Sequence, residues 1–313
     1  MTQSERAAVI LAGGDGTRLS AFTREMFGEE IPKQFCRFRS EYTLLEQTWR
    51  RGLLIDPAHT ITVLTASHAR FFVPLLEGIP NEQVVVQSVN RGTAPAILYS
   101  LTRLKRMAPD CSVALFPSDH FVDDDREFMR HVEAAFHAID ARPEKIVLLG
   151  VEPTRADPQY GWIEPGEFLT NECEPVRQIR RFWEKPPLPI AHRLMGTGCL
   201  WNSFVIVARL STFLGLFLIA MPELWGAFLA VETVLGTPSE ESRLRRLYDN
   251  IGQSSFSDEV LVKCPHNLAV LQVNGVEWDD LGDPTRLIKF LGRSPGNAQG
   301  SKQLTSSRRC SSE

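Results

Sequence analysis

The stretch from Leu11 to Leu19 combines residue types that bind phosphate groups. Three of the four residues at positions 13–16 are glycines, so the backbone there can adopt positive φ angles and bring its N–H groups against a phosphate. Arg18 and, farther along the chain, Lys33 supply the positive charge that a triphosphate needs. We therefore predict a phosphate-binding loop made of Leu11, Ala12, Gly13, Gly14, Asp15, Gly16 and Thr17.

Two common glycine motifs do not fit this stretch. A P-loop has a lysine directly after its last glycine, whereas Gly16 is followed by Thr17 and Arg18. A dinucleotide-binding fingerprint has a third glycine where Leu19 stands here. Glycines alone also fit a purely structural turn, and the cations Arg18 and Lys33 favour phosphate binding over that alternative.

Two aspartates stand where an open α/β sheet places its ligand site. Asp119 follows the apolar residues 112–116, and Asp280 follows the apolar residues 268–273 through a turn at Gly275. Ligands bind at the carboxyl ends of such strands, and two carboxylates can hold one Mg²⁺ that also bridges phosphates. The alternatives are a helix cap for Asp119 and a turn residue for Asp280.

The loop and its cations resemble a family signature. Residues 13–19 together with Pro32-Lys33-Gln34-Phe35 are similar to the signature of sugar-phosphate nucleotidyltransferases. The Lys-Gln-Phe ending favours the mannose-1-phosphate guanylyltransferase branch. The resemblance runs from about Val9 to about Leu287. One departure is that residues 28–31 look like an insertion between Arg18 and Lys33, which lengthens the loop over the site.

The resemblance implies a reaction and its site. GTP, or another NTP, and mannose 1-phosphate, or a related aldose 1-phosphate, would give a GDP-sugar and pyrophosphate with Mg²⁺ as the cofactor. Asp119 and Asp280 match the metal-binding aspartates of the family, and Arg18 and Lys33 complete the catalytic set. The other positions that match are those for the nucleotide base, Gln87, Arg91 and Thr93, and those for the sugar phosphate, Gly161, Glu184, Lys185 and Asn202. In the base region, Asn90 and Arg91 stand in the reverse of the family's order.

Each matched residue also has a plainer interpretation. Thr93 or Asn90 could cap a helix, Lys185 could be a solvated lysine, and Gly161 and Asn202 could be turn residues. Residues 123–125 are expected to cap the next helix, and Asp279 to point away from Asp280. His120 is expected to be neutral and packed, because phosphoryl transfer from a sugar phosphate needs no base.

Other functions stay open beside this one. A nucleotidyltransferase could use a heptose phosphate. A metal-dependent glycosyltransferase could use the strand-end aspartate, and a non-catalytic sensor could bind a nucleotide sugar. A glycosyltransferase would not need the glycine loop with Arg18 and Lys33, and the presence of these cations with Asp119 and Asp280 argues against a sensor.

Alternating apolar strands and amphipathic helices predict the α/β class. The resemblance specifies a Rossmann-like, GT-A type fold, with a mostly parallel mixed sheet flanked by helices and a smaller sugar-binding subregion. We expect a nucleotidyltransferase domain at 1–293, with a nucleotide-binding half at 1–150 and a sugar-phosphate-binding half at 151–293, and a disordered tail at 294–313. The expected strands are 7–11, 60–65, 84–87, 112–116, 146–150, 260–262 and 268–273, and the expected helices are 44–54, 94–107, 127–141 and 211–234, the last interrupted at Pro222.

Composition restricts the partners. A net charge of −4 gives no broad basic field for nucleic acid. The N-terminus lacks an apolar signal core and no stretch is long enough to span a bilayer, so we expect no membrane partner and a cytoplasmic location. The six cysteines contain no C-x-x-C pair and predict reduced thiols rather than a zinc site or disulfides. A homodimer is compatible with the sequence.

Overall fold

Strands and helices alternate through the first part of the chain, close to the predicted bounds. The computed structural model describes residues 5–169 and 175–292, so the expected tail at 294–313 lies outside the described residues. The elements of the first part are β1 (Arg6–Leu11), α1 (Ser20–Phe27), α2 (Leu44–Leu53), β2 (Thr60–Thr65), α3 (Ala69–Phe72), β3 (Val84–Gln87), α4 (Thr93–Met107), β4 (Ser112–Pro117), β5 (Phe121–Val122), α5 (Asp125–Ala141) and β6 (Ile146–Val151).

The second part adds a hairpin, a long strand and a group of helices. Its elements are β7 (Trp162–Phe168), β8 (Val176–Trp183), α6 (Leu188–Gly196), β9 (Leu200–Arg209), α7 (Leu210–Ala220), α8 (Pro222–Glu232), α9 (Glu240–Asn250), β10 (Leu268–Val273), β11 (Trp278–Asp279) and α10 (Pro284–Leu291).

One expected strand is a helix. Residues 260–262 were predicted to be extended, but residues Ser257–Leu261 form a π-helix in which Val262 donates its backbone N–H to Ser257. A three-residue apolar run has no periodicity that separates a strand from a helical turn, so its β-branched valines were misleading. The interruption at Pro222 is confirmed, because that proline is the first residue of α8.

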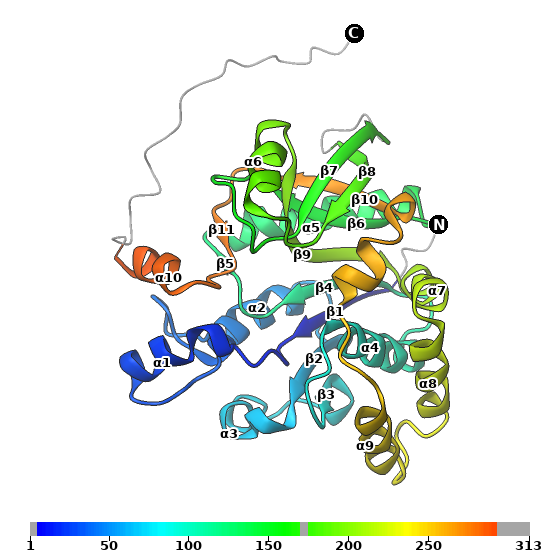
Figure 1. Cartoon of the computed structure of the whole chain (residues 1–313). Helices are drawn as coiled ribbons and strands as arrows, with labels where there is room; N and C mark the ends of the chain where they lie inside the picture. The colour runs from blue at the N-terminus through cyan, green and yellow to red at the C-terminus, as the bar shows by residue number, and fades with distance from the viewer. Residues whose placement is uncertain (1–4, 170–174, 293–313) are drawn as a thin grey trace.

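The strands form a mixed sheet, as expected. Among the described residues the strand order is β3-β2-β1-β4-β9-β6-β10-β8-β7 (Figure 1). The pairs among β1 to β4 and the β6–β10 pair are parallel, whereas β7, β8 and β9 pair antiparallel with their neighbours. Strand β7 also pairs with β9, so the pairings of β9, β6, β10, β8 and β7 close into a ring.

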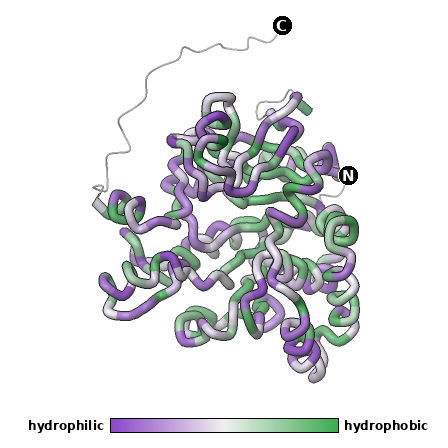
Figure 2. The backbone as a smooth tube through the Cα atoms, viewed as in Figure 1, coloured by the Kyte–Doolittle hydropathy of each residue, from purple (hydrophilic) through white to green (hydrophobic). Residues whose placement is uncertain are grey.

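Helices cover both faces of the sheet, and the core lies between them. One buried cluster joins alternate residues of β1, β2 and β4 to α4, α7 and α8, and another joins the remaining face to α5 and α6. Figure 2 shows hydrophobic residues along the central strands and along α7 and α8, with hydrophilic residues prominent toward the outside. No helix among the described residues is long and apolar enough to cross a membrane.

Strand register brings the candidate site together at one edge of the sheet. Leu11 pairs with Pro117 across parallel β1 and β4, so the glycine loop and Asp119 emerge side by side. A separate two-stranded sheet pairs Asp279 of β11 with Phe121 of β5. This short pairing places Asp280 beside the segment that carries Asp119, although the two are far apart in sequence.

Candidate active site

The glycine loop is fixed through its carbonyl groups. The Gln34 amide donates to the carbonyl oxygens of Ala12 (3.0 Å) and Gly14 (2.7 Å), and the Thr65 hydroxyl donates to that of Gly13 (2.9 Å). The C=O and N–H of a trans peptide point in opposite directions, so the N–H groups that follow these carbonyls face away from Gln34 and Thr65. The loop therefore presents backbone donors of the kind that bind phosphate.

Two glycines of the loop lie where a side chain would be unfavourable. Gly16 has a φ of 63°, in the left-handed region that favours glycine. A Cβ atom on Gly13 would lie 2.6 Å from the Gln87 side-chain nitrogen, which is closer than real Cβ contacts allow. The loop thus approaches the end of β3, where Gln87 also accepts a hydrogen bond from the Tyr248 hydroxyl (3.2 Å).

Lys33 connects the two predicted metal-binding aspartates. It begins a 3-10 helix (Lys33–Phe35) and is only 4% exposed. Its ammonium lies 2.9 Å from an Asp119 carboxylate oxygen and also donates to the backbone carbonyl of Asp280. The 28–31 segment does not displace Lys33 from these contacts. Gly28 ends α1 with a φ of 80°, and the Ile31 N–H donates to the Thr23 hydroxyl of the same helix.

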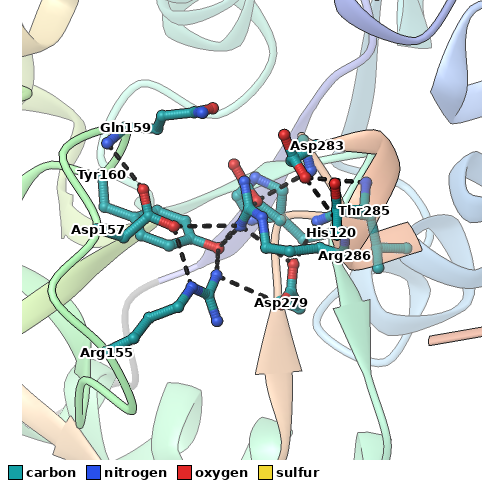
Figure 3. A network of polar contacts seen from close by, with 12 residues as sticks. His120, Arg155, Asp157, Gln159, Tyr160, Asp279, Asp283, Thr285 and Arg286 are labelled. Carbon is teal, nitrogen blue, oxygen red and sulfur yellow. Dashed lines mark hydrogen bonds and ion pairs between the residues drawn. The ribbon is translucent and has the colours of Figure 1, made fainter. Parts of the chain in front are cut away.

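Asp280 is held by several hydrogen-bond donors. Its Oδ1 accepts from the Tyr160 hydroxyl (2.9 Å), the Arg286 guanidinium (2.6 Å) and the Gly282 N–H (3.0 Å). Figure 3 shows Arg286 and Arg155 approaching the Tyr160 hydroxyl from different sides. Burial alone raises the pKa of Asp280, but Lys33 and Arg286 outweigh it and lower that pKa to about 2, so Asp280 is ionised at neutral pH.

Asp119 is ionised and its neighbour His120 is neutral. Burial works to raise the pKa of Asp119, but the Lys33 ammonium holds that pKa below its ordinary value. Burial lowers the pKa of His120 to about 4, and its ring packs edge-on against Trp278 with 5.2 Å between ring centroids. His120 is thus packed and neutral at pH 7, as predicted from the sequence.

The two aspartates can contribute to a divalent cation site only together with other ligands. The Oδ1 atom of Asp280 is saturated by its donors, which leaves Oδ2. Lys33 pairs with Oδ2 of Asp119, and Oδ1 of Asp119 lies 3.6 Å from Nε2 of the neutral His120. The described residues contain no group of three or more His, Cys, Asp or Glu side chains suited to a metal ion. Two carboxylate oxygens completed by phosphate and water are a donor set that fits Mg²⁺.

The region predicted for base binding combines the start of α4 with a distant segment of the chain. Gly92, with a φ of 87°, is the N-cap of α4, so neither Asn90 nor Thr93 caps the helix through its side chain. The Thr93 hydroxyl instead accepts the N–H of Phe256 (2.8 Å). Asn90 donates to Asp15 of the glycine loop (2.9 Å). The start of α4 is thus tied both to the loop and to the segment before the π-helix.

The residues predicted for sugar-phosphate binding form a close cluster around Gly161. A Cβ atom on Gly161 would lie 3.1 Å from a Glu184 carboxylate oxygen and 3.3 Å from the Asn202 Cβ. Lys185 pairs with Glu184 (3.1 Å) and has a φ of 43°, a strained conformation for a lysine. Burial raises the pKa of Glu184, although Lys185 works to lower it. The ordered set inferred from the resemblance therefore lies together in space.

One cavity of about 390 Å³ contains most of these positions. Lys33 does not line it but contacts Asp119 and Asp280, which do. Arg91 donates to the Tyr248 carbonyl (2.9 Å) outside the lining, and Ala12, Asp15, Gly16 and Thr17 of the loop do not line the cavity either. The predicted residues that line the cavity are Leu11, Gly13, Gly14, Arg18, Gln87, Thr93, Asp119, Gly161, Glu184, Lys185, Asn202 and Asp280.

Sequence reasoning missed the residues that orient Asp280. Tyr160 and Arg286 bind its carboxylate, and Arg286 lies one helical turn past the Asp283-Pro284 pair that starts α10. The Asp-Pro pair was a usable signal for a helix start, which would have placed Arg286 in the first turn of a helix shortly after Asp280. Nothing in the sequence indicated that Gln253, Ser255 and Ser257 line the cavity.

The site combines a glycine loop with ionised aspartates at the carboxyl ends of strands. The sheet that carries them is covered by helices on both faces. These features are typical of α/β proteins that bind phosphorylated ligands. Residues 7–215 match the nucleotidyl transferase family. The chain belongs to this family.

Named relatives agree with this assignment. The xanthan biosynthesis protein XanB of Xanthomonas campestris pv. campestris is 31% identical over 67% of this chain and 44% of its own length. A mannose-1-phosphate guanylyltransferase of Escherichia coli is 26% identical over 88% of this chain and 59% of its own length. The chain thus spans about half the length of these relatives.

A solved structure shares the fold across nearly the whole chain. The crystal structure described as a mannose-1-phosphate geranyltransferase from Thermus thermophilus has a TM-score of 0.77 and 26% identity. It covers 93% of this chain and 80% of its own. The similarity extends beyond residue 215 and therefore includes the part of the chain that carries Asp280.

Proposed function

We propose that this protein transfers a nucleotidyl group from a nucleoside triphosphate to a sugar 1-phosphate. The pair we favour is GTP with mannose 1-phosphate or a related aldose 1-phosphate, giving a GDP-sugar and pyrophosphate. The names of the Escherichia coli and Thermus relatives support mannose 1-phosphate as the acceptor. The Lys33-Gln34-Phe35 sequence supports the same choice.

The observation that carries the proposal is the shared cavity. The glycine loop and Arg18 line it together with Asp119 and Asp280, and so do Gly161, Glu184, Lys185 and Asn202. A triphosphate needs the first group, with its backbone donors and cation, and a hydroxyl-rich sugar phosphate needs the second, with its amide, carboxylate and ammonium. A cavity with both groups suits the meeting of two phosphorylated substrates.

The chemistry follows from the charge of the acceptor. An oxygen of the sugar 1-phosphate is already ionised, so it can attack the α-phosphorus directly. A P–O bond forms to that oxygen while the bond to the leaving pyrophosphate breaks, and no proton needs to be removed first. The protein then contributes orientation and charge neutralisation. This route needs no general base, and the neutral state of His120 agrees with it.

The residues divide this work between them. Arg18 lies beside Asp280: a Cβ atom on Gly282 would be 3.0 Å from the Arg18 guanidinium and 2.7 Å from Asp280 Oδ2. Lys33 adds positive charge at the same end and keeps Asp119 ionised. Asp119 and Asp280 would hold Mg²⁺, which when bound neutralises phosphate charge and stabilises the leaving pyrophosphate. Lys185 would bind the acceptor phosphate.

A substrate panel tests the proposal. Pyrophosphate release is measured for each pair of four NTPs with several aldose and heptose 1-phosphates, with Mg²⁺ present and again after chelation. We expect metal-dependent release that is greatest for GTP with mannose 1-phosphate. If no pair releases pyrophosphate, the transferase proposal is wrong; nucleotide-sugar binding without turnover would instead indicate a sensor.

A lysine variant separates this mechanism from a glycosyltransferase. Lys33→Ala should lower the rate by about 10²- to 10³-fold, the size expected for losing one group that stabilises transition-state charge. Lys105→Ala, in α4 and outside the cavity lining, is the matched control and should keep wild-type activity. Intact activity in Lys33→Ala would favour a glycosyltransferase, which does not need this cation.

A further inference from the structure

A second hollow, lined by arginines, lies outside the catalytic cavity. It has a volume of about 510 Å³ and is formed by the β7–β8 hairpin and α6, which lie at the top of the view in Figure 1. Its lining shares no residue with the catalytic cavity. We call this hollow the arginine groove, and its charged lining residues are Arg177, Arg180, Arg181, Arg193 and Glu164.

The arginine groove has an excess of positive charge. Glu164 is its one carboxylate among the described lining residues, and it pairs with Arg180 at 3.4 Å. The structure gives Arg181 and Arg193 no carboxylate within salt-bridge distance among the described residues. The chain as a whole carries a net charge of −4, so this positive charge is local rather than part of a basic surface.

Trp183 holds two of these arginines in place. The Arg181 guanidinium lies 3.6 Å from the centroid of a Trp183 ring, and that of Arg193 lies 5.8 Å from it. Cation–π contacts of this kind orient a guanidinium while leaving its N–H donors free.

We propose that the arginine groove binds a diphosphate group. Guanidinium groups bind phosphate oxygens in pairs of parallel hydrogen bonds. The four arginines and one glutamate of the groove leave an excess of three positive charges. A phosphate monoester carries about 1.5 to 2 negative charges near neutral pH, so two linked phosphoryl groups balance this excess better than one does. The ligand is inorganic pyrophosphate or the diphosphate portion of a nucleotide, since both present the same chemistry to the arginines.

Calorimetric titration of the full chain tests this site. Inorganic pyrophosphate and, separately, GDP are titrated in a metal-free buffer into wild type, Arg181→Gln/Arg193→Gln and Lys33→Gln. The control is Arg243→Gln/Arg246→Gln, which removes the same charge from exposed positions on α9. Lys33→Gln alters the catalytic cavity through the contacts of Lys33 with Asp119 and Asp280, so a binding event that it weakens is assigned to that cavity. Circular dichroism checks that each variant is folded, and Arg193→Gln alone serves if the double variant is not.

Apart from any binding in the catalytic cavity, we expect a binding event that weakens by about tenfold or more in Arg181→Gln/Arg193→Gln, as for the loss of charge-assisted hydrogen bonds. That event should persist in Lys33→Gln and in the α9 control. Tighter binding of GDP than of pyrophosphate would identify a nucleotide as the ligand, and the reverse would identify pyrophosphate. Wild-type affinity and stoichiometry in Arg181→Gln/Arg193→Gln, or an equal loss in the α9 control, would overturn the proposal.

Discussion

Lys33 supplies the positive charge that lets Asp119 and Asp280 lie close together. A buried ammonium is tolerated only when carboxylates or hydrogen bonds compensate it, and here Asp119 and the Asp280 carbonyl do so. The same contact keeps Asp119 ionised by lowering its pKa against the effect of burial. The sequence predicted Lys33 as a cation of the site. That its ammonium contacts the aspartates from outside the cavity lining became visible only in the structure.

Arg286 compensates the negative charge of Asp280, as Lys33 compensates that of Asp119. Both partners of the Arg286–Asp280 pair are nearly buried, at 12% and 13% side-chain exposure. Removing one partner leaves a buried charge without compensation, which typically costs about 3 to 5 kcal/mol. We expect Arg286→Met to lower the free energy of unfolding by about 3 kcal/mol, measured by urea denaturation at pH 7.

The pH dependence gives this prediction a second test. The pKa of Asp280 is about 2 in the folded protein, below its ordinary 3.8, so its ionised form adds stability that is complete above the ordinary value and is lost as the pH falls toward 2. The stability difference between wild type and Arg286→Met should therefore shrink on acidification below about pH 4. Arg243→Met on the surface of α9 is the control, and an equal loss in it would contradict the prediction.

At the scale of elements, the segment before the π-helix connects the two sides of the cavity. Ser254 donates its N–H to the Arg91 carbonyl (2.9 Å) and accepts the N–H of Ala94 (3.2 Å) at the start of α4. Ser257, in the π-helix, lines the catalytic cavity together with Glu184. π-Helical turns occur often at functional sites, and here the turn brings Ser257 into the cavity wall.

Gly92 tests how closely this segment must pack against α4. A Cβ atom on Gly92 would lie 2.2 Å from the Ser254 carbonyl oxygen, and the φ of 87° is itself unfavourable for alanine. Gly78 has a φ of 85° but no atom within 4 Å of the added Cβ. We expect Gly92→Ala to be destabilised beyond the ~1 to 2 kcal/mol that positive φ alone costs, and Gly78→Ala to lose only that amount.

Thermal and urea denaturation of the two glycine variants provide the measurement. The Gly92→Ala variant should also bind nucleotide more weakly, because the clash displaces Thr93 and the cavity wall beside it. Equal losses of stability in Gly92→Ala and Gly78→Ala would mean that the segment yields easily and does not shape the base side.

At the scale of the whole molecule, the site depends on two parts of the chain with different contact patterns. Parallel strands β1 to β4 carry the glycine loop and Asp119, whereas the antiparallel strands β7, β8 and β9 carry the sugar-phosphate positions. The predicted halves at 1–150 and 151–293 stay a proposal. Asp280 shows one limit of that division, because β11 returns from the second half to pair with β5 of the first.

Lys185 tests whether the two substrates are bound by separate groups. Its ammonium pairs with Glu184, and its side chain is 63% exposed. It makes no hydrogen bond or ion pair with the described residues of the glycine loop. Lys185→Ala should raise the KM for the sugar phosphate by about tenfold, the loss of one charge-assisted contact, and leave the KM for the nucleotide unchanged. Steady-state kinetics with each substrate varied in turn measure this, with Lys105→Ala as control; an equal rise in both KM values would refute separate binding.

The sequence alone determined the features that depend on local chemistry. Residue types a few positions apart indicate the glycine loop with its cations, the apolar strands and the amphipathic helices. The expected strand positions are accordingly confirmed for β1 to β4, β6 and β10. The capping role of the acidic run at 123–125 is also confirmed, because Asp124 accepts the Glu127 N–H. The resemblance of the motifs identified the family for the same reason.

The tertiary structure decided which residues meet across long stretches of chain. Arg286, Tyr160 and Asp280 form one network, and Ser254 packs against Gly92, only because distant strands pair and bring them together. The π-helix at 257–261 replaced an expected strand for a related reason, since its short apolar run has no period of its own and adopts the backbone that its neighbours permit. Non-local pairing of strands and charges has no signature in a single sequence, so the placement of Asp280 beside Asp119 had to come from the fold.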